Sequence, residues 1–111
     1  MSSDASAPGQ PPAPGQPPAP LFVVLYSSAD NVAVKAPPVF PAHKARLDEF
    51  HARGELLMVG TFGDPQSEGS MAIFRTREGA EEFVAGDPFV REGVVKSWQI
   101  RQWNEALRGQ R

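Results

Sequence analysis

The sequence predicts an α+β fold in the order β-α-β-β-α-β, the ferredoxin-like motif, in which an antiparallel sheet carries two helices on one face. Two observations predict it. Apolar runs rich in β-forming residues occur four times, and a segment with helix signals separates the first run from the second and the third from the fourth. The chain of 111 residues is long enough for one small domain.

Residues 1–20 are expected to form a disordered tail. The segment holds seven of the 12 prolines and contains the hexad Ala-Pro-Gly-Gln-Pro-Pro twice in tandem, at 7–12 and 13–18. Such a composition buries too little apolar surface to offset the entropy lost on ordering. We interpret the tail as a spacer rather than a ligand for proline-binding grooves, because it lacks flanking charges. The folded domain is expected over 21–103, and 104–111 as a polar end.

The first strand is expected over residues 21–26, the apolar run Leu-Phe-Val-Val-Leu-Tyr, which a polar turn follows. Three prolines then indicate a loop. The last of them, Pro41, suits the first turn of a helix, because its missing N–H costs no hydrogen bond there. We therefore expect a helix over 41–53, with Gly54 as its left-handed terminator.

The second half of the domain is predicted to contain a hairpin, a helix and a last strand. Turn residues separate the expected strands 55–62 and 70–75, which should pair antiparallel. Thr76 can cap the second helix, which should end at Gly86 before a proline. The final strand is expected over 94–103.

Charge and composition argue against several classes of function. Eleven Lys and Arg against 13 Asp and Glu give a net charge of −2, without the basic excess that binds nucleic acid. The absence of cysteine excludes disulfides, thiolate metal sites and a cysteine nucleophile, and two histidines are few for a metal cluster. No run approaches the roughly 20 apolar residues of a membrane span. We expect no metal, no nucleic-acid partner and no membrane association, and a cytoplasmic location.

The expected strands carry apolar side chains on both faces of the sheet. In the first strand two apolar sets alternate: Leu21, Val23 and Leu25, then Phe22, Val24 and Tyr26. Two helices can cover only one face, and the other face would be an apolar patch that a second copy of the chain can cover. We therefore expect a homodimer in which two sheets pack as an α+β barrel. The alternative is that loops or the tail cover this face.

Two residues could support acid–base chemistry. His43 lies four and seven residues before Leu47 and Phe50, and so shares the apolar face of the first helix, whereas Asp87 follows the second helix. A histidine on an apolar face is most often a satisfied core residue, and aspartate before proline is common turn chemistry. If they meet, they form a base and its orienting group. Their spacing leaves both interpretations open.

Several short motifs together resemble the YCII-related family. They are Pro-Ala-His-Lys-Ala-Arg-Leu at 41–47, His51, Gly54, Leu56-Leu57, Gly60, Gly69-Ser70, Asp-Pro-Phe at 87–89 and Gly93-Val94. The resemblance implies ferredoxin-like subunits that pair as a dimeric α+β barrel. It also implies an active site in which His43 and Asp87 form a His-Asp dyad, with Ser70 at the same pocket.

Phe40 departs from the family pattern. Members often carry an arginine directly before the Pro-x-His sequence, where this chain has Phe40. An arginine can bind an anionic group, whereas a phenyl ring offers an apolar wall or a stacking surface. We therefore expect Phe40 to contact a small-molecule substrate that is not anionic.

Two hypotheses for the function follow. The first is a cofactor-independent enzyme in which His43 is the general base or acid and Asp87 fixes its tautomer. The resemblance implies elimination or hydrolysis of a small, often aromatic, ring compound. The second is a non-catalytic module on the same barrel that binds a small ligand or a protein. A cofactor-free monooxygenase or isomerase ranks below both.

Overall fold

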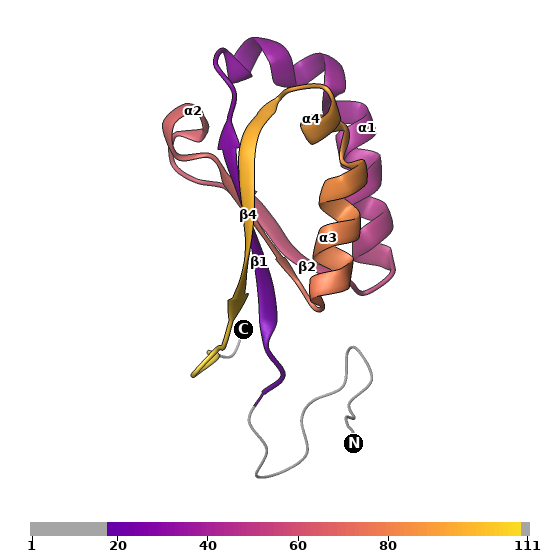
Figure 1. Cartoon of the computed structure of the whole chain (residues 1–111), viewed down its shortest axis with the longest axis vertical. Helices are drawn as coiled ribbons and strands as arrows, with labels where there is room; N and C mark the ends of the chain where they lie inside the picture. The colour runs from indigo at the N-terminus through magenta and orange to yellow at the C-terminus, as the bar shows by residue number, and fades with distance from the viewer. Residues whose placement is uncertain (1–17, 110–111) are drawn as a thin grey trace.

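In the computed structural model, which describes residues 18–109, four strands form one antiparallel sheet in the order β2-β3-β1-β4 (Figure 1). The strands are β1 (Leu21–Ser28), β2 (Leu56–Thr61), β3 (Ser70–Phe74) and β4 (Val95–Trp103). Strand β1 pairs with both β3 and β4, and β2 pairs with β3 as the expected hairpin. The predicted fold class and the four predicted strands are confirmed. Most of the predicted tail lies outside the described residues.

Two longer helices cover one face of the sheet. They are α1 (Val32–Ala52) and α3 (Arg77–Gly86), and Figure 1 shows them side by side. Two single-turn helices complete the order: α2 (Pro65–Glu68) in the expected turn between β2 and β3, and α4 (Pro88–Arg91) directly after α3. None of the helices among these residues is both long and apolar enough to cross a membrane.

Helix α1 is longer than the sequence predicts. It begins at Val32 rather than Pro41 and includes Pro37, Pro38 and Pro41 in its interior. The prediction of a loop rests on the missing proline N–H, which removes a hydrogen bond from a helix interior and bends the helix. Figure 1 shows α1 crossing the upper end of the sheet before it turns down along the sheet face. The prolines thus lie within a bent helix.

A contact from α2 stabilises the start of α1. The Asn31 backbone adopts a left-handed conformation, with φ 58°, and its side chain does not cap the helix. Instead the Gln66 side chain accepts a hydrogen bond from the Val32 N–H at 2.9 Å and donates one to the Ala29 carbonyl at 2.9 Å. The beginning of α1 therefore depends on a residue 34 positions further along the chain, which is why local signals do not predict it.

The core lies between these helices and the sheet. Three buried phenylalanines meet there, one each from α1, β3 and α3: Phe83 lies 5.3 Å from Phe50 and 5.2 Å from Phe74 between ring centroids. Smaller side chains complete the cluster: Val24, Leu56, Ala72, Ala80 and Val84. Phe50 is fully buried, as its place on the apolar stripe of the helix predicts.

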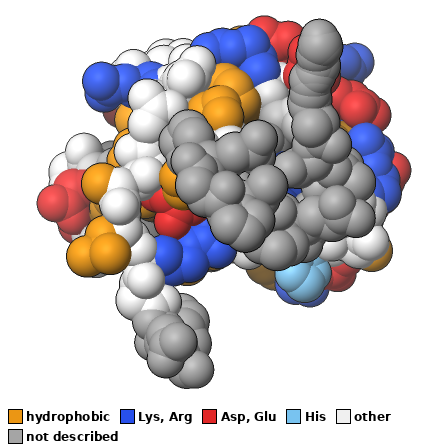
Figure 2. Space-filling view, turned by 90° about the horizontal axis from the view of Figure 1, so that it is seen from below, with side chains coloured by type: hydrophobic (Ala, Val, Ile, Leu, Met, Phe, Trp, Pro, Cys, Tyr) orange, Lys and Arg blue, Asp and Glu red, His pale blue; other side chains and the backbone are white. Residues whose placement is uncertain are grey.

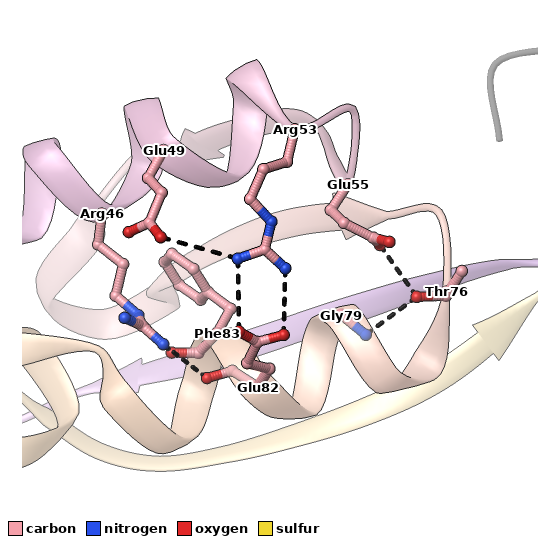
Figure 3. Close-up of polar contacts among 8 residues, drawn as sticks. All are labelled: Arg46, Glu49, Arg53, Glu55, Thr76, Gly79, Glu82 and Phe83. Atoms are coloured by element: carbon pink, nitrogen blue, oxygen red, sulfur yellow. Dashed lines mark hydrogen bonds and ion pairs between the residues drawn. The ribbon is translucent and has the colours of Figure 1, made fainter.

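Polar contacts fix α3 against α1 (Figure 3). The Arg46 guanidinium donates to the main-chain oxygens of Glu82 at 2.8 Å and Phe83 at 3.1 Å, near the end of α3. Arg53 forms ion pairs with Glu82 at 3.1 Å and Glu49 at 3.7 Å. Arg46 therefore holds the C-terminal end of α3, and with it the residue that follows, in place beside α1.

The start and end of α3 agree with the prediction. Thr76 accepts a hydrogen bond from the Gly79 N–H at 2.9 Å, and its hydroxyl donates to Glu55 at 2.9 Å (Figure 3). The helix ends at Gly86. Helix α1 likewise ends before Gly54, which has the left-handed φ of 81° that suits a terminating glycine.

The second face of the sheet carries its own apolar cluster. We call it the open face, because α1, α3 and α4 lie on the other side (Figure 1). Its members come from three strands: Leu21, Val23, Leu25, Leu57, Met71 and Ile73. A hollow of about 370 Å³ on this face also has Arg101 and Trp103 in its wall. Figure 2 views the molecule from the lower end of Figure 1 and shows hydrophobic side chains at the surface among charged ones.

Replacement of Phe83 by alanine should destabilise the domain strongly. Phe83 is 1% exposed and touches both other core phenylalanines, so the cavity should lower the free energy of unfolding by about 3–5 kcal/mol. Urea denaturation followed by circular dichroism measures this loss. The matched control is Phe62→Ala, because Phe62 is 40% exposed. Equal losses in the two variants would show that the core is not centred on Phe83.

Candidate functional site

The structure brings His43 and Asp87 into direct contact. Nδ1 of His43 lies 2.7 Å from Oδ1 of Asp87, although the two residues are 44 positions apart in the sequence. Asp87 is completely buried and His43 is 8% exposed. A buried carboxylate of this kind needs hydrogen-bond donors, because an unsatisfied charge in the interior is costly.

Asp87 also has the turn role that its sequence context indicates. It stands between α3 and α4, where its extended backbone ends the one helix and begins the other. Its Oδ1 accepts a hydrogen bond from the Phe89 N–H at 3.0 Å and so caps α4. The turn and the contact with His43 are therefore compatible, since the same oxygen serves both.

Tyr26 supplies the third donor to Asp87. Its phenol donates to Oδ2 at 2.6 Å. By its sequence pattern Tyr26 belongs only to an apolar strand face. The signal that could have revealed its role is that this face points to the helices, where a buried phenol needs an acceptor. Burial raises the pKa of Tyr26 well above its ordinary value near 10; the charge of Asp87 and the hydrogen bond to it add to this, and the charge of Arg46 opposes it.

An ionised Asp87 selects one tautomer of the neutral His43 ring. A carboxylate only accepts hydrogen bonds, so the hydrogen between Nδ1 and Asp87 belongs to the imidazole. In the neutral ring Nε2 then carries a lone pair. A nitrogen of this kind, on a side chain that is nearly buried, can accept a proton from a bound molecule and return it.

Aromatic rings fix the plane of His43. Phe89 stacks on the imidazole with a centroid distance of 3.7 Å and an interplanar angle of 3°. Phe83 approaches edge-on at 6.4 Å, and Phe40 lies tilted at 6.2 Å. Phe40 is 47% exposed. It thus lies beside His43 and at the surface, where it can meet a molecule that approaches from solvent.

Ser70 lies beside Tyr26, which stands between it and the dyad. It lies opposite Tyr26 in the β1–β3 pairing, so the two side chains share the helix face. Tyr26, rather than the serine, contacts Asp87. The preceding Gly69 has a positive φ of 76°, and a side chain there would collide with the main-chain oxygen of Tyr26. The Gly-Ser motif therefore allows β3 to begin close beside Tyr26.

Within residues 18–109, no group of three or more histidine, cysteine, aspartate or glutamate side chains could hold a metal ion. The other histidine, His51, is exposed. The same outer surface of α1 carries an ion pair of 2.8 Å between Lys44 and Asp48.

Comparisons with known proteins identify the family. The model of the YCII-related domain matches residues 21–104. Protein YciI of Escherichia coli O6:H1 and of Shigella flexneri is 28% identical over 97 residues, which cover 78% of this chain and 99% of each relative.

Two solved structures have a similar fold. One is 5-chloro-2-hydroxyhydroquinone dehydrochlorinase (TftG) from Burkholderia phenoliruptrix, in complex with 2,5-dihydroxybenzoquinone; its TM-score is 0.61 at 21% identity, over 78% of this chain and 95% of that one. The other is PA3566 from Pseudomonas aeruginosa, with a TM-score of 0.50 at 17% identity, over 84% of this chain and all of that one.

Ionisation of Tyr26 should be coupled to unfolding. Because the folded state raises the pKa of this phenol, its stabilising contribution is complete below about pH 10 and is lost as the pH rises further. Tyr26 is the single tyrosine of the chain, so tyrosinate absorbance reports it alone. We expect this absorbance to appear only together with the loss of the circular dichroism signal. Tyrosinate formation near pH 10 in a protein that is still folded would contradict the buried hydrogen bond to Asp87.

Proposed function

The chain belongs to the YCII-related family, and we propose that it is a small enzyme that acts on a small molecule through a His43–Asp87 acid–base dyad. The observation that carries this proposal is the 2.7 Å contact between His43 and a completely buried carboxylate. Proton transfer by such a pair requires neither a metal nor an organic cofactor.

In the proposed reaction, Nε2 of His43 takes a proton from a hydroxyl group, an acidic C–H or a water. Asp87 holds the imidazole in the Nδ1–H tautomer and stabilises the imidazolium that forms, because the two then carry opposite charges at 2.7 Å. In an elimination, the leaving group departs with the electron pair of its bond, and the proton remains on His43 until it is returned to solvent. Neutral imidazole suits this role near physiological pH.

We infer that the substrate is a ring compound. Phe40 and Phe89 place two aromatic surfaces beside His43, with centroids 6.4 Å apart, and aromatic side chains favour contact with other rings. The structural neighbour TftG is, by its name, a dehydrochlorinase of a chlorinated hydroxyhydroquinone. Elimination or hydrolysis of a small aromatic or quinonoid compound is therefore the reaction class that we propose. Phe40 and Ser70 are the proposed substrate contacts, in addition to the dyad.

The alternative is that the chain only binds a small ligand. The same residues could hold a ring while His43 donates or accepts one hydrogen bond. Affinity without turnover would distinguish this function from catalysis.

We further propose that two copies pair through their open faces, as in a dimeric α+β barrel. The support is the apolar cluster on that face, with Met58 at 59% and Trp103 at 49% exposure beside it. Exposed apolar surface of this kind favours association, and a two-fold dimer is the commonest form.

Loss of the imidazole should slow turnover strongly while ligand binding survives. A screen of chlorinated and hydroxylated aromatic compounds, with turnover detected by chloride release and ultraviolet absorbance, identifies a substrate. With that substrate, we expect His43→Asn to lower kcat by roughly 10²–10⁴-fold. The matched control is His51→Asn, at an exposed position of the same helix. Unchanged turnover in His43→Asn would disprove the catalytic role, and binding without turnover by the wild type would favour the ligand-binding alternative.

A charge on the open face should prevent association. Met71 belongs to the open-face cluster, so Met71→Glu should yield monomers while the core on the helix side stays intact. Light scattering at micromolar concentration measures the mass. Val34→Glu is the control, because Val34 is 74% exposed on α1 and this variant should remain a dimer. A monomeric wild type at this concentration would disprove the dimer.

A further inference from the structure

The two oxygens of Asp87 have different partners. Oδ1 contacts both Nδ1 of His43 and the Phe89 N–H. Oδ2 receives the phenol of Tyr26 at 2.6 Å, its one hydrogen bond among the described residues. Since the carboxylate is completely buried, removal of the phenol would leave Oδ2 without a donor.

Tyr26 fixes the carboxylate relative to the sheet. His43 and Asp87 both come from the helical layer, whereas Tyr26 lies in β1, which pairs with strands on both sides. Its partners across the strands are Ser70 in β3 and Trp98 in β4. The phenol oxygen therefore has a fixed position, and its bond to Oδ2 keeps the carboxylate from rotating away from His43.

Arg46 does not take over this role. Its charge acts on the ionisation of Tyr26, but its guanidinium donates to the main-chain oxygens of Glu82 and Phe83. Among the described residues, the hydrogen bonds to Asp87 therefore come from Tyr26, His43 and the Phe89 N–H. Burial and the neighbouring carboxylate keep the phenol in its neutral form, so it remains a donor throughout the physiological range.

We propose that Tyr26 is a positioning residue of the dyad: its hydrogen bond to Oδ2 orients Asp87 and disperses the charge of the carboxylate, so that the carboxylate favours the imidazolium less strongly and Nε2 of His43 remains available as a base. The proposal rests on the proposed function of His43 and Asp87. Without the phenol, the buried negative charge lacks one of its three donors, and the pair compensates by taking up a proton. The imidazolium that forms has no lone pair on Nε2, so the base is lost even though His43 and Asp87 remain in contact.

Nitrogen-15 NMR of the histidine rings tests this without a substrate, because it distinguishes the two neutral tautomers from the doubly protonated ring. In Tyr26→Phe, we expect the ratio of doubly protonated to neutral His43 at a fixed pH to rise on the order of tenfold, as befits loss of a hydrogen bond to a charged group. His51 is the internal reference in the same spectrum. The matched control variant is Trp98→Phe, because Trp98 lies opposite Tyr26 and is not among the hydrogen-bond donors to Asp87; it should leave the ratio unchanged.

The single tyrosine allows a second measurement that does not depend on whether Tyr26→Phe folds. Biosynthetic fluorotyrosine replaces Tyr26 alone and is a stronger donor, so it should lower the same ratio in the folded protein. An unchanged ratio in both Tyr26→Phe and the fluorotyrosine protein, with an altered His43 tautomer in Asp87→Asn, would overturn the role of Tyr26 and leave the dyad intact. If Asp87→Asn also left the His43 ring unchanged, the proposed dyad itself would fail.

Discussion

The rest of the structure depends on the burial of one carboxylate. Asp87 has no contact with solvent, and its donors come from three different elements: His43 from α1, Tyr26 from β1 and the Phe89 N–H from α4. A buried charge that loses a partner costs several kcal/mol. The sheet, the long helix and the turn after α3 must therefore dock together in one arrangement, and that arrangement also orients the imidazole.

Contacts outside the dyad help to hold these elements in the same arrangement. Arg46 binds the carbonyls of Glu82 and Phe83 in the last two turns of α3, the helix that ends just before Asp87, and its cation also lies over the ring of Phe50 at 4.9 Å. It can do both because a guanidinium has several donors and a flat face. On the sheet side, Gly69 lets β3 begin against the main chain of Tyr26. The site is thus assembled on residues that are not members of the dyad.

The features that the sequence predicts are those with local causes. Apolar runs rich in β-forming residues define the strands, Thr76 and Gly86 bound α3, and the spacing from His43 to Phe50 places both on the buried side of α1. The start of α1 has a distant cause, the side chain of Gln66, and three prolines argue locally against it. Tyr26 is overlooked for the same reason. The five residues before it are apolar, and its acceptor is 61 residues away.

Successive side chains of β1 point to opposite faces of the sheet, so this strand links the two faces. Leu25 belongs to the open face and Tyr26 to the dyad, although they are consecutive residues. A slip of one residue in the β1–β3 register would exchange the faces, moving the phenol away from Asp87 and placing Leu25 beneath α1. Apolar residues on both faces cannot prevent this slip by hydrophobicity alone, since either register buries apolar side chains. The hydrogen bond from Tyr26 to the buried carboxylate distinguishes the registers, so the interaction that orients the base also specifies the pairing of the sheet.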